Sequence, residues 1–243
     1  VRVIQVLPAG ASPHTFDLTP GKVRELQEAA IIFKIGIMDD WIDAVAESLP
    51  EVAVVTLRKN VPLRPFPGGG HGHGAVDPHY WLSAANGARM ARTVAETLAA
   101  AYPGRAAVYE KNGRAVAAEL TDLHGELQRE LSGLRDRRMV VFHDAWRYFA
   151  AAYGLEIAAV FQSSPGREPT PRDIRELYAL AGKYRLRTIF TEPQLPTAAI
   201  EPMMADLGLE AVIIDPLGGS AAGDSYAALL RRNARAIRRA LEH

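Results

Sequence analysis

Cysteine is absent from this sequence of 243 residues, and neither sign of charge is in excess. Without thiolates the chain cannot form disulfides, iron–sulfur clusters or cysteine-ligated zinc sites. The 28 lysine and arginine residues equal the 28 aspartate and glutamate residues. The sequence therefore predicts no general positive field for nucleic acid. Uninterrupted apolar runs of roughly 18 residues, which a membrane-spanning helix needs, are also missing.

The sequence does contain an ordinary globular composition, with 48% hydrophobic and 23% charged residues. Short apolar segments alternate with helical patterns along the whole chain, which is typical of a parallel α/β architecture. The short segments are rich in valine and isoleucine, as strands buried on both faces are. The predicted strands are 1–7, 30–35, 52–57, 139–142, 157–161, 188–191 and 211–214.

A long helical region divides the chain. The pattern predicts one helix over 79–102 and a second over 105–134, with Pro103 and Gly104 between them. We therefore expect an N-terminal α/β lobe (1–104), a connecting helix (105–134) and a C-terminal α/β lobe (135–243). The apolar stripe of the connecting helix is Val108, Val116, Leu120, Leu123, Leu127, Leu131 and Leu134.

Polar residues that suit a metal ion lie where predicted strands end. His14 follows the first strand, His143 and Asp215 directly follow two later apolar runs, and His79 lies where a long loop enters a helix. Ligands of α/β sheets bind beyond the carboxyl ends of the strands, and imidazole nitrogen with carboxylate oxygen suits zinc. A site built from residues so far apart in the chain predicts assembly at a junction of the two lobes.

Six segments, in this order, resemble the zinc- and manganese-specific solute-binding proteins of bacterial ABC importers, the ZnuA/TroA-like family. The segments are GASPHTFDLTP, DPHYWL, FHDAWRYFAAAYGL, TPRDIREL, FTEPQ and IIDPLG. The resemblance covers essentially the whole chain. It implies two doubly wound parallel-sheet lobes joined by one long rigid helix, with the metal in the cleft between the lobes.

Residue by residue, the resemblance assigns the metal ligands to His14, His79, His143 and Asp215. Manganese-preferring relatives often carry glutamate where His143 stands, so the histidine favours zinc as the transported ion. The resemblance also implies delivery of the ion to a membrane permease. We expect a monomer in the periplasm or at the cell surface, either free or attached to the membrane by a lipid anchor. We expect no enzymatic activity and no nucleic-acid partner.

The sequence departs from the resemblance in two places. Family members usually begin with a further strand and helix ahead of the stretch that matches Val1. The loop that precedes His79 is often rich in histidine and acid, whereas here His71 and His73 alternate with glycine. These two histidines fit either an ordinary loop or a low-affinity zinc collector. His124 and His243 receive no role.

Three alternatives stay open at this stage. Manganese, as the alternative ion, accepts the same ligand set. A zinc-dependent hydrolase would use Glu192, in the segment TEPQ, as a general base. An adhesin-like surface protein would use the metal as a structural clip. For Glu192 we favour a hydrogen bond to a ligand imidazole, and for Asp144 a helix cap.

Overall fold

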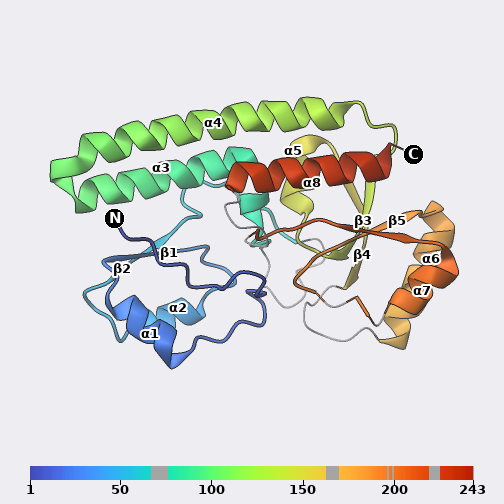
Figure 1. Cartoon of the computed structure of the whole chain (residues 1–243), viewed down its shortest axis with the longest axis horizontal. Coiled ribbons are helices and arrows are strands. Elements are labelled where there is room, and N and C mark those ends of the chain that lie inside the picture. The colour runs from blue at the N-terminus through green and yellow to red at the C-terminus, as the bar shows by residue number, and fades with distance from the viewer. Residues whose placement is uncertain (67–75, 163–169, 196, 199, 219–224, 243) are drawn as a thin grey trace. The chain divides into compact units, whose positions relative to one another are not determined.

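The computed structural model describes residues 1–66, 76–162, 170–195, 197–198, 200–218 and 225–242 (Figure 1). His71, His73 and His243 lie outside the described residues. The chain divides into two compact units, Val1–Leu123 and His124–His243. Each unit is α/β with a parallel sheet. Among the described residues, no helix has both the length and the apolar character needed to cross a membrane.

The first unit contains a parallel pair of strands with helices packed on it. Its elements are α1 (Pro20–Gln27), β1 (Ile31–Lys34), α2 (Trp41–Ala46), β2 (Ala53–Thr56), the 3-10 turn η2 (Tyr80–Leu82), α3 (Ala84–Ala101), the 3-10 turn η3 (Pro103–Arg105) and the first part of α4 (Ala106–Ser132). A core of Leu26, Ile32, Ile42 and Leu49 joins α1, β1 and the α2 region. Helix α1 begins at Pro20, and the side chain of Thr19 caps it by accepting a hydrogen bond from the Lys22 amide.

Two predictions for this unit are wrong. Residues 1–7 are not a strand, and the side chains of Val1 and Val3 are exposed, because β-branched composition does not make a strand without a paired neighbour. The helix predicted over 79–102 is interrupted. Ser83 has extended backbone angles (φ −103°, ψ 122°) and separates η2 from α3.

Helix α4 is continuous over its 27 residues, and the unit boundary falls inside it. Gly113 does not break the helix. A Cβ atom at Gly113 would lie 2.3 Å from the Cβ of Ala95 on α3, so glycine permits close contact between the two antiparallel helices (Figure 1). The buried stripe differs from the predicted one, because Val108 and Val116 are exposed. It consists of Gly113, Ala117, Leu120, Leu123, Leu127 and Leu131.

The second unit is built on a four-stranded parallel sheet in the order β4-β3-β5-β6. Its helices lie on both sides of the sheet, with α6 and α7 on one side and α5 and α8 on the other (Figure 1). The α6 and α7 side contributes a core that includes Phe142, Leu177 and Met203. The elements are β3 (Arg138–His143), α5 (Arg147–Tyr153), β4 (Glu156–Gln162), α6 (Pro171–Tyr184), β5 (Thr188–Thr191), α7 (Glu201–Leu207), β6 (Glu210–Ile213) and α8 (Tyr226–Leu241).

Six of the seven predicted apolar runs are strands, β1 to β6. Each of these strands begins and ends within one residue of its predicted run. Helix α6 begins with a reciprocal capping box formed by Thr170 and Asp173. Both α/β units, their parallel strands and the long helix confirm the fold class. Because the strands are parallel, the carboxyl ends of β3, β5 and β6 lie at the same end of the second sheet. The residues considered next follow these carboxyl ends.

Candidate functional site

In the first unit, His14 and His79 lie close together although 65 positions separate them. Their ring centroids are 5.6 Å apart, and each ring offers a nitrogen within 4.8 Å of the other's. His14 lies in the loop that follows residues 1–7, and its amide donates a hydrogen bond to the Ser12 hydroxyl. His79 precedes η2 directly. Two of the sequence-predicted ligands are therefore neighbours within one unit.

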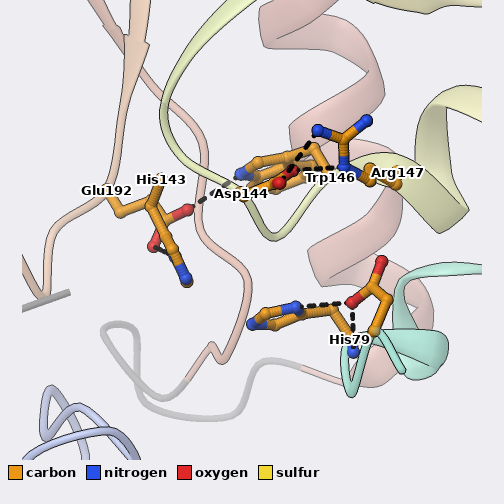
Figure 2. A network of polar contacts seen from close by, with 7 residues as sticks. His79, His143, Asp144, Trp146, Arg147 and Glu192 are labelled. Atoms are coloured by element: carbon orange, nitrogen blue, oxygen red, sulfur yellow. Dashed lines mark hydrogen bonds and ion pairs between the residues drawn. The ribbon is translucent and has the colours of Figure 1, made fainter. Parts of the chain in front are cut away.

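A buried carboxylate fixes the ring of His79. Asp77 Oδ1 lies 2.8 Å from His79 Nδ1 and also accepts the His79 backbone amide at 2.9 Å (Figure 2). Asp77 is 0% and His79 is 1% exposed. When Nδ1–H donates to the carboxylate, Nε2 carries the lone pair that a metal would bind.

The second unit repeats this arrangement at His143, the last residue of β3. Glu192, directly after β5, places Oε2 at 3.1 Å from His143 Nδ1 (Figure 2). The Trp146 indole N–H donates to the other oxygen of Glu192 at 2.9 Å. All three side chains are buried. Glu192 therefore holds the His143 ring, the role favoured from the sequence, and both of its oxygens are engaged.

Asp215, two residues after β6, is held by a separate set of hydrogen bonds. Its Oδ1 accepts from Gln194 Nε2 at 2.8 Å and from the amides of Leu217 and Gly218 at 3.0 Å. Asn233 on α8 accepts the Asp215 amide and donates to its carbonyl. Asp215 is 4% exposed, and these hydrogen bonds hold its carboxylate and its backbone in place.

The segment after β5 connects both candidate ligands of the second unit. Strand β5 lies between β3 and β6. From its end, Glu192 reaches His143 on one side and Gln194 reaches Asp215 on the other. The short segment Glu192–Pro193–Gln194 therefore aligns the two side chains from a single loop.

Sequence reasoning missed Asp77, Gln194 and Asn233. The first two stand inside segments that carry the resemblance, DPHYWL and FTEPQ, so a search for carboxylates or amides within two residues of a candidate ligand or strand end would have found them. Asn233 lies 18 positions from Asp215 on a helix, and no local pattern marks it.

Two other side chains play different parts from those considered in the sequence. Asp144 does not cap α5, which begins at Arg147 after Trp146; it forms an ion pair with Arg147 instead. His124 is on α4, where its ring packs 5.5 Å from the ring of Tyr153. His124 remains outside the set of candidate ligands.

Comparison with known proteins finds similar sequences among zinc-binding and zinc-uptake proteins. The sequence model of the family "Zinc-uptake complex component A periplasmic" matches residues 1–240. The zinc-binding lipoprotein AdcA of Streptococcus pneumoniae is 25% identical over 96% of this chain, and the match covers 50% of AdcA. This chain thus spans about half the length of that relative. The high-affinity zinc uptake system protein ZnuA of Brucella abortus is 26% identical over 96% of this chain and 83% of its own length.

Solved structures agree with the sequence relatives. A zinc-bound deletion mutant of ZnuA is 30% identical to this chain. The match covers all of this chain and 90% of the mutant's chain, with a TM-score of 0.85. The solute-binding protein FpvC from Pseudomonas aeruginosa, in complex with Mn²⁺, is 25% identical over 98% of this chain and 89% of its own, with a TM-score of 0.84. These relatives are named for metal binding and transport and not for catalysis. Because the family's sequence model matches nearly the whole chain, the protein belongs to the family of periplasmic zinc-uptake components.

Proposed function

We propose that this protein captures zinc outside the inner membrane and delivers the ion to the permease of an ABC importer. The ion is the transported substrate, and its ligands are His14, His79, His143 and Asp215. Three neutral imidazoles and one carboxylate match the donor preference of zinc. Membership of the zinc-uptake family supports the same cargo.

The observation that carries the proposal is the pairing of both buried imidazoles with buried carboxylates. Asp77 holds His79, and Glu192 holds His143, each through Nδ1. A carboxylate at Nδ1 fixes the tautomer and makes Nε2 a better metal donor, as second partners of zinc-bound histidines do. The same pairing of an imidazole Nδ1 with a buried carboxylate occurs in both units.

The fourth ligand in this proposal is Asp215. Its Oδ1 accepts three hydrogen bonds, which fix the orientation of the carboxylate. One carboxylate halves the 2+ charge that three neutral imidazoles leave on zinc, which lowers the cost of desolvating the ion.

A closed set of four ligands suits a carrier and not a hydrolase. A catalytic zinc keeps an open position for water and needs a nearby general base. Glu192, the base of the hydrolase alternative, has one oxygen on His143 and the other on Trp146, so its carboxylate positions these two side chains. The hydrolase alternative is therefore not supported.

We infer the location and the partner from relatives. AdcA is named a lipoprotein and the matching family is named periplasmic, so we place the protein in the periplasm or at the outer face of the membrane. ZnuA of Brucella abortus is named as part of an uptake system, which supports a membrane permease as the partner. The protein acts as a monomer in this proposal.

Manganese remains the second candidate ion, because FpvC was solved with Mn²⁺ and has the same fold. The imidazole-rich ligand set favours zinc, which binds nitrogen donors more tightly than manganese does in the order of divalent affinities. Competition of the two ions for the purified protein separates these candidates. Displacement of bound zinc by an equal concentration of manganese would contradict the assignment of zinc.

The test of the proposed ligands is the metal content of single variants. We expect one zinc per chain in the wild type, and loss of tight binding in His14→Ala, His79→Ala, His143→Ala and Asp215→Ala. His124→Ala is the matched control, since its ring packs on Tyr153 away from these ligands, and it should retain one zinc. Full zinc retention in the four ligand variants would overturn the site.

A further inference from the structure

A second surface of the molecule lies at the free edge of the second sheet. Strand β6 pairs with β5 on one side, and among the residues that the structure describes no strand pairs with its other side. A cavity of about 920 Å³ follows this strand and is lined by all four of its residues. It also reaches Thr188 and Phe190 of β5, Arg138 at the start of β3 and the last turn of α8, so it extends from the amino ends of these strands along β6 as far as Ile213.

The strand edge along this cavity is exposed and apolar. Ile213 is 64% exposed, and Ala211 is also exposed. A strand with an unpaired edge offers a row of backbone N–H and C=O groups to another extended chain. Proteins usually protect such an edge with short or charged strands; β6 has four residues and begins with Glu210, whereas Ile213 at its other end is exposed.

Arginine side chains surround the same cavity. Four of them line it, and Asp136 neutralises one of these, Arg138, through two hydrogen bonds. Arg185 and Arg187 from the turn before β5 and Arg239 from α8 make no ion pair with any residue that the structure describes. Glu210 is the other acid of the lining. The cavity therefore carries a net positive charge beside an open strand edge.

From this combination we propose that the β6 edge binds an extended acidic segment of a partner protein by strand addition. Backbone hydrogen bonds to β6 supply affinity, and carboxylates of the segment pair with Arg185, Arg187 and Arg239. A second copy of this chain is a poor occupant, because pairing of two β6 edges would bring two positive clusters together. A small anion would use the arginines but not the strand edge.

The probe is a fluorescent eight-residue peptide in which valine and glutamate alternate. We expect it to bind the full chain with an affinity that falls as salt rises, and to bind Arg187→Glu and Arg239→Glu at least tenfold more weakly. Arg175→Glu is the matched control, an exposed arginine on α6 that does not line the cavity, and it should bind like the wild type. Circular dichroism and zinc content, both unchanged, show that the variants are folded.

Two further probes separate strand addition from simple charge attraction. The same peptide with consecutive pairs of prolines lacks N–H groups on both edges of the strand, so it cannot form the backbone ladder and should not bind. Equal binding of the proline peptide, no binding of the valine–glutamate peptide at millimolar concentration, or equal affinity of all variants would each overturn the proposal. Arginine-dependent binding to vesicles of phosphatidylglycerol without peptide binding would overturn it in favour of a membrane surface. Because zinc content is measured separately, these outcomes do not depend on the proposed transport function.

Discussion

At the scale of single residues, each buried candidate ligand is held by hydrogen bonds with other side chains of its own unit. Asp77 and Glu192 fix the two imidazoles, and Gln194 and Asn233 fix the carboxylate. These supports determine which atom each ligand presents. Preorganised donors bind tightly because little orientational freedom is lost when the ion enters.

The substitution Asp77→Asn tests this account. The amide keeps the size of the carboxylate but removes its charge, so the His79 ring loses its strongest acceptor. We expect zinc affinity to fall by about 10–100-fold, the usual effect of removing such a partner. Competition with a zinc-binding dye measures the change, and Asp144→Asn, whose carboxylate pairs with Arg147, serves as the control. Unchanged affinity in Asp77→Asn would show that the hydrogen bond only stabilises the loop.

At the scale of elements, the close contact of α3 and α4 depends on one glycine. Gly113→Ala would normally stabilise a helix by about 0.5–1 kcal/mol. Here the new Cβ meets Ala95 at 2.3 Å, so we expect a net loss of about 1–3 kcal/mol in the free energy of unfolding. Urea denaturation measures this loss. The second substitution Ala95→Gly removes the clash and should recover part of it, whereas a stabilised Gly113→Ala protein would contradict the described packing.

Helices α4 and α8 are joined by an ion pair with a defined pH dependence. The hydrogen bond and charge of Arg231 lower the pKa of Glu126 below its ordinary value of 4.5, against a smaller opposing effect of burial. A carboxyl with a lower pKa in the folded state stabilises the fold above its ordinary pKa, and the contribution is lost as pH falls through the lowered value. The side chains of Arg231 and Glu126 are 34% and 40% exposed, so solvent screens the ion pair. Its contribution to the free energy of unfolding is therefore at most about 1 kcal/mol.

The check compares wild type with Glu126→Gln. We expect the wild type to be more stable at pH 7, and the difference in free energy of unfolding to shrink as pH falls below about 4.5. Urea melts at several pH values give this difference. A difference that stays constant down to the acid limit would mean that the Arg231 interaction is not electrostatic.

The elements themselves follow closely from the sequence, whereas parts of the site do not. Six valine- and isoleucine-rich runs are strands because each pairs with a parallel neighbour, and β3 and β5 in the middle of the second sheet are largely buried. Residues 1–7 have the same composition but no paired neighbour, so composition failed there. Ser83 interrupts a helix that periodicity alone continues, although serine is a common N-cap residue with extended backbone angles.

The candidate ligands were predicted from strand ends and from the resemblance, but their supports depend on tertiary contacts. Glu192 meets His143 across 49 positions, and Asn233 meets Asp215 across 18. Spacing in the sequence cannot reveal such pairs, because they form only when β3, β5, β6 and α8 are placed in the fold. Asp77 is the exception, since it lies two residues from His79.

At the scale of the whole molecule, zinc binding should stabilise the folded chain. A ligand that binds the folded state adds RT ln(1 + [L]/Kd), about 4 kcal/mol at a thousandfold excess over Kd. We therefore expect the unfolding temperature to rise with added zinc and to fall again when a chelator removes the metal. Differential scanning fluorimetry measures both steps. The double variant His14→Ala and His143→Ala should show no rise, and an equal rise in that variant would indicate a different zinc site.

The central claim is that one zinc ion is saturated by three imidazoles and one carboxylate of this chain. X-ray absorption at the zinc edge of the loaded protein tests it most directly. The account predicts four nitrogen or oxygen ligands at about 2.0–2.2 Å, with the outer-shell scattering of three imidazole rings. A spectrum with five or six ligands, or with fewer than three imidazoles and a bound water, would contradict it.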